Sequence, residues 1–180
     1  MIPERETTSG DEPESSETFE DDAPEAEAKA AEATAAEATA AGSAAGSAES
    51  GLWKITLGEL DEKMGVKIVE ESVERVVATM PVEGNRQSFG LLHGGASLAV
   101  GEAVGSWAAV IHASTMGKTA VGIDVSATHH RSARAGTITI TATPIQLGRT
   151  LTTHEVLITN DAGQRLCTLR ITNLLLDRKS

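Results

Sequence analysis

The hydrophobic pattern between residues 94 and 114 predicts the dominant element of this chain, a single long helix. The run is almost entirely small or apolar, and it is rich in alanine, leucine and valine. About 20 residues at 1.5 Å per residue correspond to a helix of roughly 30 Å. A helix that is apolar on most of its sides must be covered by other elements, so we expect it at the centre of the fold.

Alternating apolar and polar positions predict strands on both sides of this helix. A long strand is predicted over 66–82, where valine, isoleucine and threonine mix with charged residues. Four strand-like runs follow the helix, at 120–130, 137–147, 150–160 and 164–176. The run TITITATPI alternates strictly, as in a sheet with one solvent-facing side. Hairpin turns are predicted at 147–149 and 160–163.

A short helix is predicted before the first strand. Thr56 and Glu59 have the spacing of a capping box, and Gly65 after Met64 suits the end of the helix. One apolar helix and about five antiparallel strands can bury each other's apolar faces when the sheet curls around the helix. This arrangement is an α+β fold. One flank of the helix would then stay open, and edge-to-edge dimerisation would close it.

Charge is spread unevenly and divides the chain into two parts. Residues 1–50 carry 14 acidic and two basic side chains, whereas residues 51–180 are nearly neutral. The first part is also alanine-rich, with low-complexity AEATA and AGSA units and few branched aliphatic residues. Such a segment cannot bury enough apolar surface to offset its ordering entropy. We therefore predict a disordered acidic tail over 1–50, serving as a solvating extension or an interaction tail, and one folded domain over 51–180.

The remaining composition narrows the classes of protein. The start is acidic and has no apolar core of a signal peptide. No stretch is expected to reach the roughly 18 apolar residues of a membrane span. The near-neutral domain does not indicate nucleic-acid binding. The single Cys167 is expected to be a small core residue. A cytoplasmic protein without nucleic-acid or membrane partners is the resulting expectation.

The chemistry of the chain concentrates between Asn85 and Trp107, which reads NRQSFGLLHGGASLAVGEAVGSW. Glu102 is the only charged side chain between Arg86 and Lys118. An isolated carboxylate on an apolar helix is costly to bury, so either catalysis or a solvated helix face must explain it. The residue types within this stretch favour catalysis.

Several groups near Glu102 suit acyl transfer to water. The His93-Gly94-Gly95 turn opens the helix, where unpaired backbone N–H groups can donate to an oxyanion. Ser106 lies on the same helix face as Glu102, four residues later. Gln87 adds a neutral amide that can donate to a carbonyl. The alternative is an ordinary helix start followed by a solvated glutamate.

Two segments, FGLLHGGASLAVGEAVGS and VGIDVSATHHR, resemble the hotdog-fold acyl-CoA thioesterases. The nearest branch contains phenylacetate-pathway thioesterases, the enterobactin proofreading thioesterase and the 1,4-dihydroxy-2-naphthoyl-CoA thioesterase. The resemblance covers roughly residues 51–176. It implies a hotdog fold, in which a curved antiparallel sheet wraps a long central helix. It also implies a homodimer as the catalytic unit, often paired into a tetramer.

The resemblance also assigns roles to five catalytic positions. It implies that Glu102 is the nucleophile or general base, and that Gln87 and the Gly94 N–H lie at the thioester carbonyl. His93 would orient substrate or assist the leaving thiolate, and the Ser106 hydroxyl would hold a water. In this family the glutamate of one subunit faces the glutamine and glycine of the other.

A second group is implied to contact the substrate or its coenzyme A part. Its members are Gly95, Val121, Gly122, His129, His130 and Arg131. Arg131 suits a phosphate because a guanidinium can bond two oxygens at once, and Arg134 could share this role. His112 and His154 are expected to be surface or strand residues without a role. No metal site and no cofactor are expected, since coenzyme A is part of the substrate.

The resulting hypothesis is hydrolysis of an acyl-CoA thioester with an aromatic or medium-chain acyl group. Val100, Val104 and Trp107 are expected to form an apolar surround for that group. A leading candidate substrate is 1,4-dihydroxy-2-naphthoyl-CoA. The alternatives are a hotdog hydratase or dehydratase acting on CoA thioesters, and a non-enzymatic acyl-CoA sensor.

Overall fold

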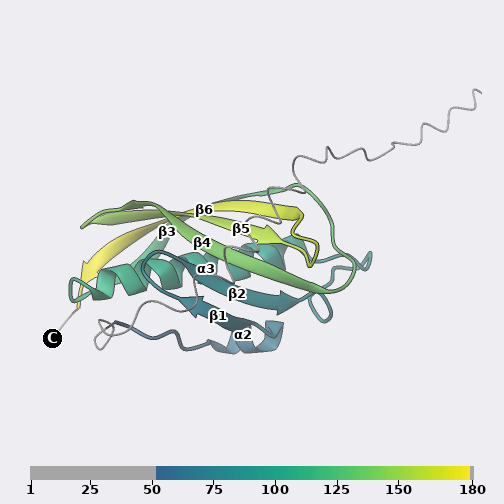
Figure 1. Ribbon diagram of the computed structural model, residues 1–180, viewed down its shortest axis with the longest axis horizontal. Coiled ribbons are helices and arrows are strands. Elements are labelled where there is room, and N and C mark those ends of the chain that lie inside the picture. Colours follow the sequence, from purple (N-terminus) through teal and green to yellow (C-terminus); the bar gives the residue numbers. More distant parts are fainter. Residues whose placement is uncertain (1–51, 179–180) are drawn as a thin grey trace, which may run out of the picture.

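The computed structural model describes residues 52–178, which form one curved antiparallel sheet around a central helix (Figure 1). The strand order is β1-β2-β4-β5-β6-β3. The elements are α2 (Glu59–Met64), β1 (Lys67–Glu71), β2 (Val76–Pro81), α3 (Gly94–Ser114), β3 (Lys118–His129), β4 (Thr137–Leu147), β5 (Leu151–Thr159) and β6 (Arg165–Asp177). The expected α+β architecture is confirmed, and the tail predicted over 1–50 lies outside the described residues.

Helix α3 lies against the sheet along a stripe of small residues. Every fourth position is buried: Ser97, Gly101, Gly105, Ala109 and Ala113. A Cβ added at Gly101 or Gly105 would come within 2.5 Å of a sheet side chain, Leu169 or Ile171. The helix axis therefore lies closer to β6 than larger residues would permit. The predicted bounds of this helix are confirmed.

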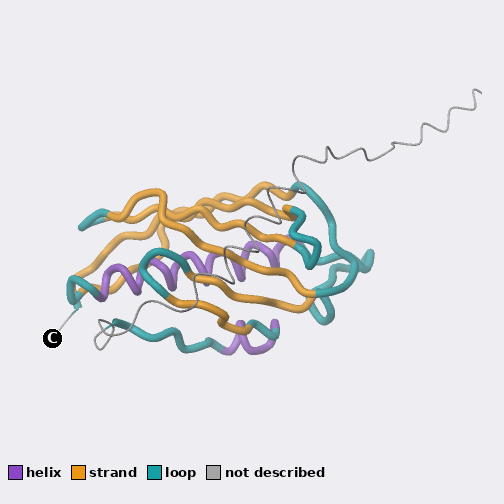
Figure 2. Tube along the Cα trace, viewed as in Figure 1, coloured by secondary structure: helices purple, strands orange, loops and turns teal. Residues whose placement is uncertain are grey.

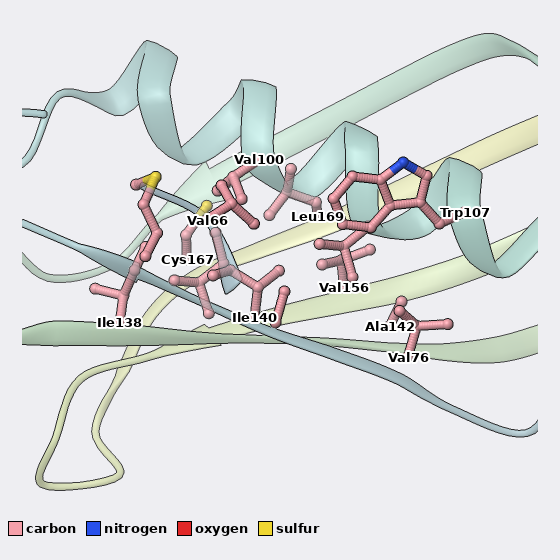
Figure 3. Close-up of a cluster of buried hydrophobic side chains, with 14 of the residues drawn as sticks. Val66, Val76, Val100, Trp107, Ile138, Ile140, Ala142, Val156, Cys167 and Leu169 are labelled. Carbon is pink, nitrogen blue, oxygen red and sulfur yellow. The ribbon is translucent and has the colours of Figure 1, made fainter. Parts of the chain in front are cut away.

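The residues beside this stripe build the core and not a substrate pocket. Val100 and Val104 have no exposed surface, and Trp107 is 8% exposed. Figure 3 shows Val100 and Trp107 among Leu169, Val156 and other sheet residues. The expectation that these three side chains surround the acyl group is therefore wrong, because their helix face points into the sheet.

The single strand predicted over 66–82 is in fact two strands, so the sheet has six strands and not five. Ser72 closes the turn between β1 and β2, since its N–H donates to the Arg75 carbonyl (2.9 Å) and its Oγ accepts from the Arg75 N–H (3.0 Å). β1 then folds back on β2 in antiparallel register. A four-residue turn, 72–75, is enough to reverse the chain, although the β pattern continues on both sides of it.

Helix α2 begins two residues later than its predicted capping box. Gly58 is the N-cap, and its N–H donates to Asp61 Oδ2 (2.9 Å). The predicted end is confirmed, with Gly65 in the left-handed region (φ 74°). The four later strands agree with prediction within two residues at each end, and both hairpin turns are confirmed. The alternation of β4 places Ile138, Ile140 and Ala142 in the core.

β3 is an exposed edge of the sheet. It is twelve residues long, it pairs only with β6 among the described residues, and most of its side chains are exposed. A bulge between Gly122 and Asp124 shifts its register. Val121 and Ile123 are 43% and 55% exposed. A long unpaired edge carrying apolar side chains is a surface suited to pairing with another chain.

Within residues 52–178, α3 is long and apolar enough to cross a membrane by length and composition. The expectation that no stretch approaches this criterion is therefore wrong. In the structure the helix is the core element under the sheet, with half of its most apolar window buried (Figures 1 and 2).

Cys167 is buried as expected, and burial raises the pKa of its thiol.

Candidate active site

The first turn of α3 leaves one backbone donor unpaired. His93 is the N-cap: its Nδ1 accepts from the Gly95 N–H (2.8 Å), and its carbonyl accepts from Ala96 and Ser97. The Gly94 N–H has no acceptor among the described residues. It lies at the positive end of the helix dipole, which favours an oxyanion. Because Nδ1 accepts a hydrogen bond, a neutral His93 ring carries its proton on Nε2. The Nε2–H group can therefore donate to a partner outside the helix.

Gln87 is held by a tight turn just before this helix. Its backbone N–H donates to the Leu91 carbonyl (2.8 Å), and its carbonyl accepts from the N–H of Gly90, which has φ 77°. Its side-chain Oε1 accepts from the Phe89 N–H. Because only the oxygen of an amide can accept, the Nε2 group points elsewhere as a donor. A second neutral donor is thus fixed near the start of α3.

Gln87 and Gly94 border a pocket of about 370 Å³ at the N-terminal end of α3, whereas His93 is exposed and is not among its lining residues. Gln87 and Gly94 line it from one side, and His129, His130 and Arg131 line it from the end of β3. The remaining lining residues are Leu91, Leu92, Ser97, Ser132, Ala133 and Leu166. Figure 2 shows that loops gather at this end of the molecule. The pocket thus combines a small apolar wall with donors and one cation.

The segment after β3 is tied to its neighbours by hydrogen bonds. The N–H groups of His130 and Arg131 both donate to the Leu166 carbonyl, and the His130 ring contacts Thr168 Oγ1 (3.0 Å). The imidazole of His129 covers the start of α3, since a Cβ added at Gly94 would lie 3.1 Å from its Nε2. Five of the predicted site residues are therefore brought together in this pocket.

A second group of polar residues lies further along α3. Glu102 is exposed, Ser106 is half-buried, and both side chains face Gly122 of β3. A Cβ added at Gly122 would lie 3.6 Å from Glu102 Oε1 and 3.7 Å from Ser106 Oγ. The predicted shared face of Glu102 and Ser106 is confirmed. Asn173 joins the group, because its Nδ2 donates to Ser106 Oγ (3.2 Å).

The two groups are separate within one chain. Gly94 and Glu102 are eight residues apart on α3, about 12 Å along the helix axis. Their neighbours on β3, His129 and Gly122, are seven residues apart, roughly 20 Å of extended chain. Reacting atoms must approach within about 3–3.5 Å. One chain therefore does not bring the Gly94 donor and the Glu102 carboxylate to the same carbonyl.

Sequence reasoning missed Asn173 and did not foresee that His154, a strand residue as expected, is buried. Asn173 has no exposed surface and lies between Ile171 and the run of leucines at 174–176, so this polar residue could have been singled out. His154 is in β5 as expected but is fully buried, and neither ring nitrogen has a partner among the described residues. Burial lowers the pKa of His154 to about 4, with a smaller contribution from nearby His112.

Among the predicted substrate-contacting residues, Gly95, Val121 and Arg131 are exposed.

The geometry agrees with comparisons to known proteins. The Thioesterase superfamily model matches residues 89–167, which span the start of α3, Glu102 and Ser106. The proofreading thioesterase EntH of Cronobacter turicensis is 36% identical over 122 residues, covering 67% of this chain and 88% of the relative. The chain belongs to the thioesterase superfamily.

Solved thioesterase structures show the same fold. Thioesterase HI1161 of Haemophilus influenzae aligns with a TM-score of 0.64 and 34% identity, covering 70% of this chain and 95% of that one. Thioesterase SAV0944 of Staphylococcus aureus aligns with a TM-score of 0.63 and 32% identity, covering 66% and 98%. The expected hotdog fold is confirmed, and this protein is an enzyme of the thioesterase class. The roles of its individual site residues remain predictions.

Proposed function

We propose that this thioesterase hydrolyses an acyl-CoA thioester in a site shared by two copies of the chain. The observation that carries the proposal is the separation of the two polar groups, donors at the start of α3 and a carboxylate about 12 Å further on. In a homodimer, the Glu102 of one subunit would face the Gln87 and Gly94 of the other. The exposed β3 edge, with Val121 and Ile123, supplies a pairing surface beside Glu102.

A relative supports the choice of Gln87 and Glu102 as partners. Solved structures of the Staphylococcus aureus thioesterase include one with a glutamine replaced by alanine and one with a glutamate replaced by alanine. Those two positions are 15 residues apart. Gln87 and Glu102 are separated by the same 15 residues. The equal spacing supports a common functional pair.

In the proposed mechanism, the thioester oxygen accepts from the Gly94 N–H and the Gln87 Nε2. Both donors are fixed before substrate arrives, so they stabilise the oxyanion without reorganisation. Glu102 either attacks the thioester carbon to form an anhydride or takes a proton from an attacking water. Collapse of the tetrahedral intermediate breaks the C–S bond. The Nε2–H of His93 donates a hydrogen bond to the departing thiolate, and the proton that completes the thiol comes from the water through Glu102. In the anhydride route, that water hydrolyses the acyl–Glu102 anhydride, which releases the acid and regenerates the carboxylate.

The pocket at the helix start supports an assignment of the substrate. Arg131, which is exposed and has no ion-pair partner among the described residues, would meet a phosphate of coenzyme A. His129, His130, Gly95 and Val121 would border its pantetheine and nucleotide parts. We propose an aromatic or medium-chain acyl group, because Leu91, Leu92 and Leu166 are apolar wall residues. Among the candidates, 1,4-dihydroxy-2-naphthoyl-CoA is the leading one.

The proposal requires no metal and no cofactor besides the coenzyme A of the substrate, and it places the enzyme in the cytoplasm. Membership of the thioesterase superfamily favours hydrolysis over the hydratase and sensor alternatives. A hydratase would leave the thioester intact, and a sensor would bind it without turnover. Release of free coenzyme A thiol from a panel of CoA thioesters separates all three.

Glu102→Gln tests the mechanism directly. Glutamine is nearly isosteric but is neither a nucleophile nor a base of useful strength. We expect kcat to fall on the order of 10²-fold or more, which is roughly 2.7 kcal/mol of barrier. Affinity for a non-hydrolysable thioether analogue should change little. Single-turnover hydrolysis and analogue titration on one preparation measure both effects.

A matched control is Glu155→Gln, an exposed glutamate of β5 outside the proposed site. It should keep the parental kcat. The mechanism would be wrong if Glu102→Gln turned over at a near-parental rate.

A further inference from the structure

Asn173 is a fully buried amide in an otherwise apolar part of β6. Its register partners are Gly122 on β3 and Thr152 on β5, so it lies between the edge strand and the interior of the sheet. Neither Asn173 nor Thr152 has any exposed surface. A polar side chain is costly at such a position unless its hydrogen bonds compensate. Its one hydrogen bond in the described residues leads to the catalytic face of α3.

That hydrogen bond sets the direction in which Ser106 can donate. Asn173 Nδ2 donates to Ser106 Oγ at 3.2 Å. A hydroxyl has one proton and two acceptor sites, so an Oγ that accepts from Asn173 keeps its proton for another partner. The free proton of Ser106 can therefore be donated into the space beside Glu102.

Gly122 creates that space. The position that a Cβ would occupy lies 3.6 Å from Glu102 Oε1, 3.7 Å from Ser106 Oγ and 3.8 Å from Asn173 Nδ2. Three polar atoms from α3 and β6 thus converge on one point of the edge strand. A water within about 1 Å of this point could reach hydrogen-bond distance, about 2.8 Å, from the carboxylate and the hydroxyl. A methyl group at Gly122 would occupy the same volume.

We propose that Asn173 and Gly122 build the position of the hydrolytic water. This proposal rests on the proposed function and deepens it. Ser106, oriented by Asn173, donates to the water oxygen, and Glu102 accepts one of its protons. As that O–H bond breaks, the oxygen bonds to the acyl carbon. The C–S bond then breaks, and the proton held by Glu102 passes to the coenzyme A thiolate. Asn173 is a positioning residue in this scheme.

The first test is Gly122→Ala. The new methyl makes only ordinary contacts of 3.6 Å or more, and its backbone is not in the left-handed region. The variant should therefore fold, dimerise and keep the thermal midpoint of the parent. We expect kcat to fall about tenfold or more, as part of the 10²–10⁴-fold that a placed proton acceptor contributes. KM for the best CoA thioester of the panel should stay within about threefold.

The second test is a double-mutant cycle of Asn173→Leu with Ser106→Ala. If Asn173 acts through Ser106, Asn173→Leu should lower kcat alone but add almost nothing to Ser106→Ala. A purely structural role would give additive losses together with a lower thermal midpoint. His154→Leu is the matched control. It also replaces a buried polar residue of the inner sheet face, it has no bond to Ser106, and it should keep the parental kcat.

The outcomes separate this inference from the proposed function. Parental kcat in Gly122→Ala, or additive losses in the cycle, would overturn the water position while Glu102→Gln stays inactive. Near-parental turnover by Glu102→Gln would instead overturn the proposed function. If Asn173→Leu does not fold, Gly122→Ala alone decides. A loss of kcat in that variant with parental stability supports the inference.

Discussion

His154 is a neutral imidazole enclosed by the sheet and helix α3. It has no exposed surface, and its two ring nitrogens have no partners among the described residues. Burial disfavours the charged form and lowers its pKa to about 4 from the ordinary value of 6.5. In the unfolded chain the same ring takes up a proton near pH 6.5. Folding must therefore expel that proton at mildly acidic pH.

The first prediction follows from this difference in proton binding. The free energy of unfolding should be greatest above pH 6.5 and should fall as the pH drops toward 4, because the unfolded state then binds the extra proton. The gap between 6.5 and about 4 corresponds to on the order of 3 kcal/mol. His154→Leu should remove this slope. Urea unfolding at several pH values between 7.5 and 4.5 measures it.

An exposed histidine supplies the control for this measurement. His130→Gln removes a solvent-accessible ring and should leave the slope as it is in the parent. An unchanged slope in His154→Leu would mean that other groups cause the acid sensitivity.

At the scale of the element, the close packing of α3 against the sheet depends on glycine positions that have no side chain. Gly105 lies against Ile171 and Val156, both fully buried β-branched residues of the sheet. Glycine costs helix stability relative to alanine, about 0.8–1 kcal/mol in a helix interior. It is retained here because a methyl group would come within 2.5 Å of Ile171 Cγ2. Close packing against the sheet outweighs helix propensity at this position.

The second prediction concerns Gly105→Ala. The added methyl overpacks a closed core, which typically costs 1–3 kcal/mol and exceeds the gain in helix propensity. We expect a thermal midpoint lowered by a few degrees. Combination with Ile171→Ala, which removes the opposing methyl, should be less destabilising than the sum of the single changes. Calorimetry of the four proteins gives the coupling.

Gly122→Ala is the matched glycine-to-alanine control, because its methyl meets no atom closer than 3.6 Å. It should not lower the midpoint. A Gly105→Ala protein as stable as the parent would contradict the close-packing explanation of the stripe.

The same scale explains where the sequence pattern failed. β1 and β2 read as one strand because Val, Ile and Thr continue on both sides of residues 72–75. Nothing in that run has the Asn-Gly or Asp-Gly signature of a tight hairpin. The reversal depends on Ser72, whose hydroxyl and backbone both bond Arg75. The local hydrophobic pattern identifies the strand residues. It does not show which side-chain hydrogen bonds reverse the chain between them.

At the scale of the molecule, the candidate site is divided between the start and the middle of helix α3. The Gly94 and Gln87 donors belong to the pocket at the start of α3, and Glu102 lies beside Gly122 in the middle of β3. A second copy paired along β3 would bring a foreign carboxylate to each set of donors. Each site should therefore require the donors of one subunit and the carboxylate of the other.

The third prediction tests this by complementation. Glu102→Ala and Gln87→Ala should each be nearly inactive as homodimers. A mixed dimer has one site with both defects and one with neither, so mixing exchangeable subunits should restore activity, up to about one quarter of the parental rate. Turnover after co-refolding measures it, with subunit exchange verified by native mass spectrometry. Exchange without any recovered turnover would contradict the shared site.

Although β1 and β2 were merged into one predicted strand, the amino-acid pattern was sufficient to predict the central helix, the four strands after it and the residue types of the site. These depend on local periodicity and on the short motif around His93, Gly94 and Glu102, so they can be read without a fold. The reading of Val100, Val104 and Trp107 as an acyl surround failed, since helix periodicity shows which residues share a face but not what that face contacts.

Which groups meet in space depends on how distant segments of the chain pack together. Asn173 is 67 residues from Ser106 in the chain, and their hydrogen bond exists because β6 lies beneath α3. The burial of His154 and the small stripe against Ile171 follow from the same packing. The separation of Gly94 from Glu102 follows from the rise of the helix. It points to a site shared by two subunits only because β3 is an open edge at which a second chain can pair. Contacts between distant segments are set by packing the whole chain, and local sequence does not encode them.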